Sequence, residues 1–346
     1  MSNLDKYDIS LPLYLESEYK KIFEKRSKYI FKRGVVKQLK NCFLSNSGVL
    51  ISNGLIPLNS AENLIGFEDY TFYFKHWKKA IEQYFVCRLG TSLNSMVLND
   101  QTIYYSIHTP WFGYFSWITT CLPRLLYVIE NYPEAVLIYP EEWDDIDYVK
   151  QSLYYFKGIS IRKIPKDHHV FVSKYLLVPC RSWTSHFNKI DLIKVRNFFN
   201  SKVFTKSLNF GDRIYISRKK SKRRKIVNED KLVDLLKFFH FDIICMEDFS
   251  FDEQIQIMKN TSILISSHGA GLANVNFLNE KSKIIELTPI IDDFKKFRYP
   301  FWRMSTLLDL QYYCIFCGIA NTTKDQYESD IIVDLKKIES LLIQVC

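Results

Sequence analysis

The segment TSILISSHGAGLANVNFLNEKSKIIELTP, residues 261–289, decides the fold of this chain. An apolar run ends at His268, and Gly269 and Gly271 follow it directly. The residues after the glycines predict a short helix, and a second apolar run leads to Glu286. The order is strand, glycine turn, helix, strand and acid, which is typical of α/β domains that bind nucleotides.

Each part of this segment suits a phosphate ester. Glycines let the backbone turn tightly and approach a ligand closely. A helix that starts just after them offers free N–H groups and the positive end of its dipole. Glu286, at the end of the next strand, is placed to accept hydrogen bonds from a ribose diol. The segment therefore predicts a nucleotide-diphosphate ligand. A glycine turn can also be purely structural, and His268 either donates to a phosphate, acts as an acid or base, or packs in the core.

The length and the pattern of elements predict two domains. The chain has 346 residues, too many for one ordinary core. Strands alternate with helices in both halves, which favours an α/β fold with two Rossmann-like lobes facing a central cleft. We place the domains at 1–185, with a β-meander near 35–57, and at 186–346, which ends in an amphipathic helix over 330–345.

The net charge and the composition limit the classes of binding partner and the cell compartment that we expect. The formal net charge is +9, which favours nucleotides, anionic lipid surfaces or nucleic acid. The polar N-terminus lacks an apolar signal region and no apolar run approaches the length of a membrane span, so we expect a cytoplasmic protein. Cys314 and Cys317 form a C-x-x-C within a strand-like run, which favours two ordinary thiols over a zinc site or a redox pair.

Two further segments of the second half carry candidate ligand contacts. Arg218 follows a predicted strand and Arg224 follows a turn later, so that both could clamp a pyrophosphate, although the run KKSKRRK could also be a solvated or nucleic-acid-binding stretch. The turn Glu247-Asp248-Phe249-Ser250 offers acceptors to the edge of a base, and the alternative is a plain helix start capped by Ser250. We also expect Asn228 to cap the helix that follows it.

In the first half, His108 ends a predicted strand inside an aromatic cluster and is a candidate general base. Aromatic side chains beside it could stack on sugar faces or form part of a core.

The motifs of residues 210–290 together resemble glycosyltransferase family 61, the family of transferases with an HGAGL motif. The segments that show this resemblance are, in order, YISRKKSKRRKIVNED, EDFSFDEQIQIMKNTSILISSHGAGLANVNFL and KIIELTP. In the first half, GYFSWITTCLPRLLYV is similar to the family's aromatic helix with L-P-R-L.

The resemblance implies a GT-B fold, a nucleotide-sugar donor held by the second lobe, no bound metal and inversion at the anomeric carbon. Carried over by position, the diphosphate would meet Arg218, Arg224 and the loop His268, Gly269, Ala270, Gly271 and Leu272. The base would lie near Glu247, Asp248, Phe249 or Ser250, and the ribose near Glu286.

The chain departs from the family where a catalytic base is expected. Ser116 stands where the family commonly has His, and Thr120 where it has an acid. Neither hydroxyl can act as a general base at neutral pH. We therefore name His108 first and Asp100 second as the catalytic base, with His268 as a further acid or base.

The function predicted is an inverting, metal-independent hexosyl- or pentosyltransferase without a cofactor. It would move a sugar from a nucleotide-diphosphate donor, in our expectation UDP-linked, to a surface polysaccharide or lipid-linked glycan acceptor at an anionic membrane face. The alternatives are a catalytically impaired nucleotide-sugar-binding protein and a nucleic-acid-binding protein that acts through KKSKRRK. No nucleic-acid partner is expected under the main hypothesis.

Overall fold

The computed structural model describes residues 4–32, 34–46, 48–52, 78, 81–82, 84–85, 94–107, 112–179, 186–204, 208–291, 298–321 and 326–346. The chain divides into two compact units. Unit 1 comprises Met1–Asp5 and Phe31–Thr184, and unit 2 comprises Lys6–Ile30 and Ser185–Cys346. Residues 6–30 thus belong with the C-terminal half, whereas the sequence analysis grouped them with the first 185 residues.

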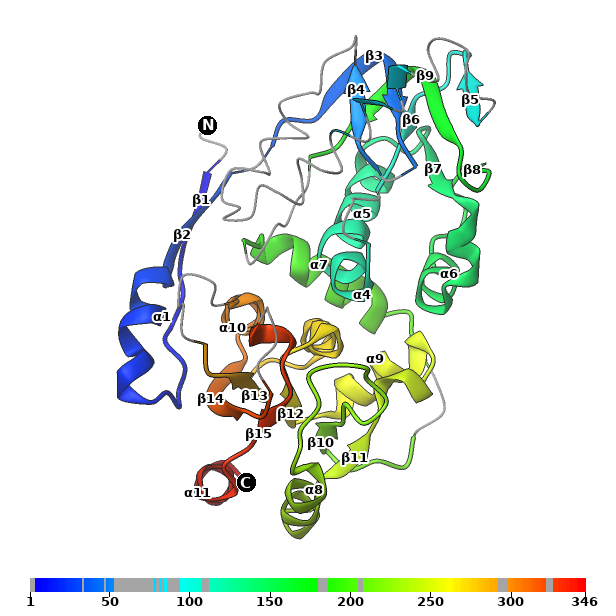
Figure 1. Ribbon diagram of the computed structural model, residues 1–346. Coiled ribbons are helices and arrows are strands. Elements are labelled where there is room, and N and C mark those ends of the chain that lie inside the picture. The colour runs from blue at the N-terminus through cyan, green and yellow to red at the C-terminus, as the bar shows by residue number, and fades with distance from the viewer. Residues whose placement is uncertain are drawn as a thin grey trace. The chain divides into compact units, whose positions relative to one another are not determined.

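Unit 1 is built on a mixed sheet with the strand order β4-β3-β9-β6-β7-β8, and β5 pairs with β9 (Figure 1). β3 runs antiparallel to β4 and β9, and the other pairs are parallel. The β3–β4 hairpin lies in the predicted meander, whose remainder from residue 53 on lies outside the described residues. The strands are β3 (Lys37–Leu44), β4 (Leu50–Ser52), β5 (Ser95–Leu98), β6 (Tyr104–Tyr105), β7 (Val136–Pro140), β8 (Ile161–Ile164) and β9 (His169–Leu177).

The segment that resembles the family's aromatic helix is helical but is irregular in its first half. It comprises α4 (Tyr114–Ser116), a π-helical turn over Trp117–Cys121 and α5 (Leu122–Asn131). Pro123 lies in the first turn of α5, where a missing N–H costs nothing, so the irregular turn precedes the proline. Unit 1 also contains the 3-10 helix η4 (Glu141–Asp145) and α6 (Asp147–Leu153).

Unit 2 carries a six-stranded sheet with the order β11-β10-β12-β13-β14-β15, parallel except for β15. Both units therefore confirm the α/β class. The strands are β10 (Arg213–Ile216), β11 (Asp242–Ile244), β12 (Ile263–Ser267), β13 (Lys283–Pro289), β14 (Gln311–Ile319) and β15 (Ile331–Ile332). The helices are α7 (Lys189–Asn200), α8 (Glu229–Phe238), α9 (Phe251–Asn260), α10 (Pro300–Leu307) and α11 (Leu335–Val345), with short 3-10 helices η5 (Met246–Asp248), η6 (Ala270–Phe277) and η8 (Gln326–Glu328).

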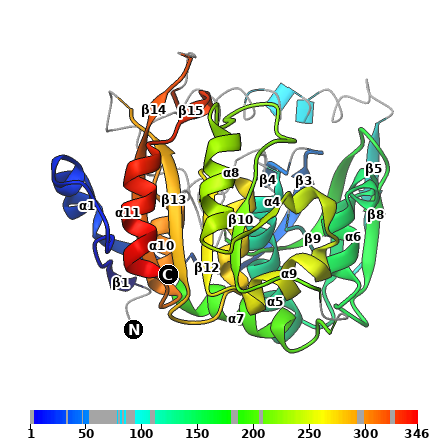
Figure 2. The same cartoon turned by 90° about the horizontal axis from the view of Figure 1, so that it is seen from below.

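Helices cover both faces of this sheet. The predicted C-terminal amphipathic helix is α11, which packs beside α8 on one face through Leu232, Leu236, Ile338 and Leu342 (Figure 2). Another layer contains α7, α9 and η6, which meet through edge-to-face contacts of Phe199, Phe251 and Phe277. Apolar side chains at alternate strand positions supply both layers, as expected for a buried parallel sheet.

The strand order reverses between β10 and β12. From β10 the chain moves outward to β11 and then returns past β10 to β12. In open α/β sheets this point leaves a crevice beyond the carboxyl ends of the two strands, where ligands bind. In this chain, Arg218 follows β10 and His268 follows β12.

The N-terminal segment folds onto unit 2. It contains the 3-10 helix η1 (Ser17–Tyr19) and α1 (Lys20–Arg26), and it is flanked by the paired strands β1 (Leu4–Asp8) and β2 (Lys28–Lys32). The Trp302 indole N–H donates to the Ser10 carbonyl over 2.7 Å. The Leu13 amide donates to the Tyr312 carbonyl over 2.8 Å. These contacts explain why residues 6–30 belong to the C-terminal unit.

Of the two predicted helix caps, one is correct. Ser250 and Glu253 form a full capping box at the start of α9. Asn228 does not cap α8, because both ends of its amide bind the backbone of Val333, over 2.8 and 3.0 Å.

The two cysteines of the C-x-x-C pair lie in the core. Cys314 and Cys317 are buried free thiols in β14. Within the described ranges, no three His, Cys, Asp or Glu side chains are grouped as a metal site. In the same part of the chain, no helix has the length and apolar character needed to cross a membrane.

Candidate functional site

The short helix that the sequence predicts after the glycine loop is present and is a 3-10 helix. η6 starts at Ala270, and the Leu272 amide donates to the Gly269 carbonyl over 3.0 Å. The amides of Ala270 and Gly271 precede this first bond, so they have no acceptor inside the helix. Ala270 is exposed, whereas Leu272 is fully buried in the core. The loop therefore presents amide donors at the carboxyl end of β12.

Arg218 packs directly against this loop. A Cβ at Gly269 would lie 2.1 Å from the Arg218 Nη1, so only glycine leaves room for the guanidinium. Its Nη2 donates to Ser221 Oγ over 2.7 Å and to the Arg223 carbonyl over 3.2 Å. Its Nε is buried and has no acceptor among the described residues. Burial lowers the pKa of Arg218, and nearby Glu247 opposes that shift.

Arg224 approaches the same loop from the other end of the basic run. Its backbone is left-handed, with φ of 58°, and its Nη1 donates to the His268 carbonyl over 3.4 Å. Burial lowers the pKa of Arg224 to about 10, and Glu328 opposes the shift. The guanidinium is thus charged at neutral pH and held at the glycine loop.

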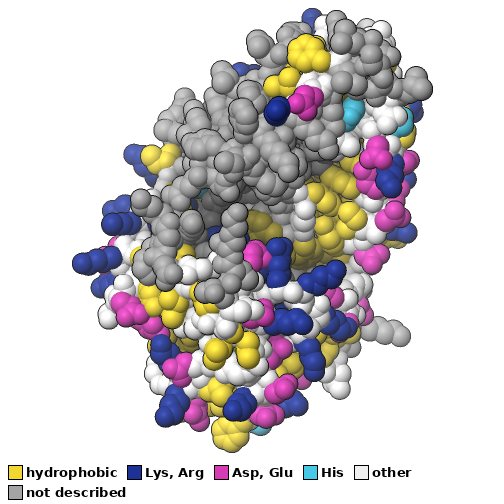
Figure 3. Space-filling model, viewed as in Figure 1, with side chains coloured by type: hydrophobic (Ala, Val, Ile, Leu, Met, Phe, Trp, Pro, Cys, Tyr) yellow, Lys and Arg dark blue, Asp and Glu magenta, His cyan; other side chains and the backbone are white. Residues whose placement is uncertain are grey.

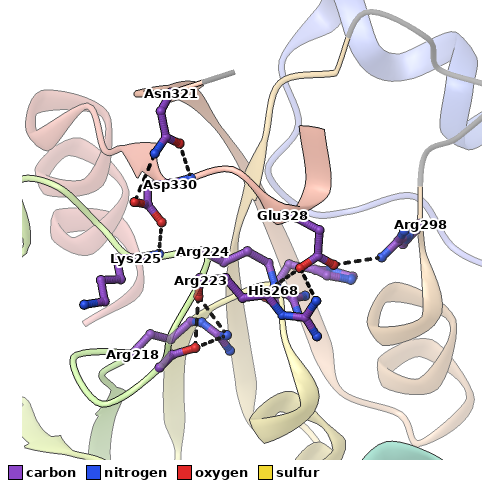
Figure 4. Close-up of polar contacts among 10 residues, drawn as sticks. Arg218, Arg223, Arg224, Lys225, His268, Arg298, Asn321, Glu328 and Asp330 are labelled. Carbon is purple, nitrogen blue, oxygen red and sulfur yellow. Dashed lines mark hydrogen bonds and ion pairs between the residues drawn. The ribbon is translucent and has the colours of Figure 1, made fainter. Parts of the chain in front are cut away.

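Glu328 lies among three arginines (Figure 4). Its carboxylate is 2.6 Å from Arg223 Nη1 and 3.9 Å from both Arg224 Nε and Arg298 Nη1. The neighbouring Asp330 accepts from the Lys225 amide over 2.7 Å, which ties the end of the basic loop to the chain before β15. Three guanidinium groups around one carboxylate leave an excess of positive charge beside the glycine loop, which suits a polyanion.

The imidazole of His268 contacts the buried carboxylate of Glu286. Its Nδ1 lies 2.5 Å from Glu286 Oε1, and the Tyr312 hydroxyl donates to Glu286 Oε2 over 2.5 Å. Glu286 is only 2% exposed. Both of its oxygens have protein partners, so the contact with a ribose suggested by the sequence stays a prediction that this arrangement does not favour.

The turn after β11 offers fewer free groups than its sequence suggested. Asp248 pairs with Lys220, and the Phe249 carbonyl accepts from the Gln254 amide over 3.0 Å. Ser250 is occupied by its capping box. Glu247 is exposed, and its carboxylate makes no hydrogen bond or ion pair within the described part of the chain.

The candidate bases of unit 1 are placed only in part. His108 lies outside the described residues. Asp100 is exposed, and its carboxylate accepts from the Thr102 amide and from the Tyr104 hydroxyl, each over 2.9 Å. These hydrogen bonds lower the pKa of Asp100, which makes it a weaker base. Ser116 is half-buried in α4, and Thr120 is buried in the π-helical turn.

The structure adds residues that the sequence analysis did not single out. Glu328 of η8 pairs with Arg223 of the basic run and with Arg298, which lies two residues before α10. Tyr312 reaches Glu286 from the adjacent β14. No spacing links these segments in the sequence, and only the strand order brings them together. Figure 3 shows Lys and Arg side chains gathered on the face of unit 2 turned to the viewer.

A doubly wound α/β unit with arginines and a glycine loop at its switch point defines a class of domain that can hold phosphate esters. The sequence profile of the family described as Glycosyltransferase 61 matches residues 114–285. The chain belongs to glycosyltransferase family 61, as its motifs suggested.

Named relatives share short segments with this chain. The EGF domain-specific O-linked N-acetylglucosamine transferase of Mus musculus is 35% identical over 80 residues, which are 22% of this chain and 15% of the relative. The Drosophila melanogaster protein of the same name is 38% identical over 76 residues, 21% of this chain and 14% of the relative. The protein O-linked-mannose beta-1,4-N-acetylglucosaminyltransferase 2 of Xenopus tropicalis is 32% identical over 132 residues, 37% of this chain and 22% of the relative. The matched segments thus span less than a quarter of each of these relatives.

Proposed function

We propose that this chain is an inverting glycosyltransferase of the GT-B type whose nucleotide-diphosphate sugar donor binds at the carboxyl ends of β10 and β12. The observation that carries the proposal is the packing of Arg218 on Gly269 at the switch point of the unit 2 sheet. Among the described residues, the buried Arg218 Nε has no hydrogen-bond partner and the first two amides of η6 have no acceptor inside the helix, an arrangement that suits an anion better than packing.

The charges suit the leaving group of such a reaction. In an inverting displacement, the acceptor hydroxyl oxygen forms a bond to the anomeric carbon while the bond from that carbon to the diphosphate oxygen breaks. Negative charge then grows on the diphosphate. Arg218, Arg224 and the amides of Ala270 and Gly271 would stabilise that charge in a fixed, partly water-excluded setting. This part of the reaction would need no metal.

The acceptor hydroxyl must be deprotonated as it attacks the anomeric carbon. The hydroxyl proton must pass to a base, and His108 remains our first proposal, ahead of the hydrogen-bonded Asp100. The names of the relatives specify N-acetylglucosamine transfer to protein-linked acceptors. We therefore propose a glycan or glycan-bearing acceptor and UDP-N-acetylglucosamine as the first donor to test. A surface polysaccharide or lipid-linked acceptor and a cytoplasmic, membrane-peripheral setting stay predictions.

Calorimetry with UDP and UDP-N-acetylglucosamine on the purified chain tests the donor site. The wild type should bind, and Arg218→Ala should weaken binding at least about a hundredfold, because it removes a charge-assisted contact from a partly buried site. Lys222→Ala is the matched control, since it removes one exposed charge from the same loop. Equal losses in both variants would mean that the loop acts only through bulk charge. Absence of binding to any nucleoside diphosphate would reject the proposal.

A second function is favoured by Ser116 and Thr120. A chain without a base could hold the donor and not transfer it. Mass spectrometry of the donor after incubation with mixed glycan acceptors separates the two functions. Release of the nucleoside diphosphate excludes the binding-only function, and intact donor after prolonged incubation supports it.

A further inference from the structure

Glu286 occupies an unusual place for a carboxylate. It lies in the middle of a parallel sheet, in register with Ser266 of β12 and Cys314 of β14, and is 2% exposed. Burying a carboxylate costs folding free energy unless hydrogen bonds compensate for the lost water. An apolar residue would pack here at no such cost, so the contacts of the carboxylate indicate what it is used for.

Those contacts define one direction of hydrogen bonding. Burial and the nearby Cys314 and Glu286 raise the pKa of Tyr312 well above its usual range, so its hydroxyl keeps its proton and donates to Glu286 Oε2. The other oxygen, Oε1, then faces His268 Nδ1 at 2.5 Å. A carboxylate in this position accepts, so Nδ1 is the ring nitrogen that carries the proton.

We propose that Glu286 and Tyr312 are positioning residues for His268, which fix the orientation and the Nδ1–H tautomer of its imidazole at the start of the glycine loop. The proposal rests on the proposed donor site and refines it. Two further contacts of His268 are with the ring of Phe301 from α10, at 5.2 Å between centroids, and with the Arg224 guanidinium at the His268 carbonyl. Neither competes for Nδ1.

The arrangement has a consequence for the ligand. The two ring nitrogens point in different directions, so a fixed Nδ1 also sets the direction of Nε2. A carboxylate that binds one ring nitrogen of a histidine fixes the orientation of the ring and changes the basicity of the other nitrogen, which can then face a ligand. Glu286 would then act on the donor through His268 and would not touch the ribose.

Isosteric variants test this device. Glu286→Gln keeps the shape, and Tyr312→Phe removes only the hydroxyl. Tyr313→Phe is the control on the same strand, because its hydroxyl meets Gln311 and not Glu286. We expect UDP affinity to fall about tenfold in Glu286→Gln and about threefold in Tyr312→Phe, and to stay unchanged in Tyr313→Phe. Melting temperatures identify any variant that fails to fold.

Two readouts separate positioning from a merely structural role. If Glu286 acts through His268, the double variant Glu286→Gln with His268→Asn binds UDP no more weakly than His268→Asn alone. Multiplied losses, or wild-type affinity in Glu286→Gln, would overturn the inference. Nitrogen NMR of the wild type should show a protonated His268 Nδ1, assigned by the His268→Asn spectrum, and an unprotonated Nδ1 would also overturn it. This spectrum decides the matter even if UDP does not bind, an outcome that would reject the proposed donor site instead.

Discussion

The guanidinium of Arg218 occupies the space that a side chain at Gly269 would fill. A Cβ at that position would be 2.1 Å from Nη1 and 3.1 Å from Cζ, well inside contact distance. Gly269 has φ of 171°, an extended backbone that any residue adopts. The requirement for glycine is therefore steric. The contact between Arg218 and Gly269 connects the segments that follow β10 and β12 at the switch point.

Gly269→Ala should consequently impair binding without impairing folding. The clashing atoms belong to the end of a flexible side chain, so the guanidinium can move away while the backbone stays. We expect UDP affinity to fall by more than about tenfold, toward the value of Arg218→Ala, with little change in melting temperature. Calorimetry checks the first quantity and thermal denaturation the second.

Gly271→Ala is the matched comparison. A Cβ there would meet Ile216 Cγ2 at 3.7 Å and Met246 Cγ at 4.0 Å, which are ordinary contacts. We expect this variant to bind UDP within about twofold of the wild type. Similar losses of affinity at both glycines would mean that loop flexibility determines binding, and not the space that Gly269 leaves for the Arg218 guanidinium.

The sequence predicts the donor half of the site because its signals are local. The order of strand, glycine loop and helix around His268 and the capping box at Ser250 both lie within a few residues of chain. The sequence predicts a short helix there but not its type, since a 3-10 helix differs from an α-helix by one hydrogen-bond step that composition does not specify. The cap assigned to Asn228 was wrong because Val333, over a hundred residues later, takes both ends of its amide.

The environment of Glu286 could not be predicted in the same way. Its position at the end of a strand after a glycine loop is typical of a ribose contact. Its actual partners depend on the parallel register that places β14 beside β13 and brings Tyr312 close. Arg298 and Glu328 illustrate the same limit, because only tertiary packing brings α10 and η8 to the basic loop.

Glu328→Gln should strengthen anion binding. The Glu328 carboxylate lies among Arg223, Arg224 and Arg298 and reduces the positive charge that a diphosphate would meet. The amide keeps the size and removes the charge, so we expect UDP and inorganic pyrophosphate to bind about threefold to tenfold more tightly at low salt. The gain should shrink as salt is added. Weaker binding would show instead that Glu328 is needed to hold the arginines in place.

The donor site should lose affinity at high pH through Arg224. Burial lowers the pKa of Arg224 to about 10, so the guanidinium is charged below that pH and loses its charge as the pH rises through it. The ratio of wild-type to Arg224→Ala affinity for pyrophosphate, which cancels the ionisation of pyrophosphate itself, should be constant between about pH 7 and pH 9 and should fall near pH 10. Arg224→Ala should bind more weakly and lack this step. A step of the same size in the variant would assign it to other groups, such as surface lysines.

Arg303 should be needed for the stability of unit 2. It is 2% exposed and lies between the rings of Tyr29 and Tyr299, at 4.3 and 4.5 Å. Its Nη2 donates to the Arg26 carbonyl over 2.8 Å and so fastens the N-terminal segment. Arg303→Met should lower the free energy of unfolding by about 2–4 kcal/mol, measured by urea denaturation. Lys21→Met, an exposed change in the same segment, should change it little, and equal losses would contradict the assignment.

Glu247 is the carboxylate that we expect to recognise the ribose. Glu286 has both oxygens bound by His268 and Tyr312, whereas Glu247 is exposed in η5, directly after β11, and lies close enough to oppose the pKa shift of Arg218. A carboxylate accepts two hydrogen bonds from a vicinal diol. The wild type should therefore bind UDP about tenfold more tightly than 2′-deoxy-UDP, and Glu247→Ala should bind the two about equally.

Asp248→Asn is the control for this prediction, because the Asp248 carboxylate is already paired with Lys220. It should keep the preference for the ribonucleotide. Calorimetry with the two nucleotides on the wild type, Glu247→Ala, Asp248→Asn and Glu286→Gln gives the affinity ratio directly and is insensitive to a general loss of affinity. A preference that survives in Glu247→Ala but disappears in Glu286→Gln would return the ribose contact to Glu286, and the short distance between Glu286 and His268 would then have to lengthen when the donor binds.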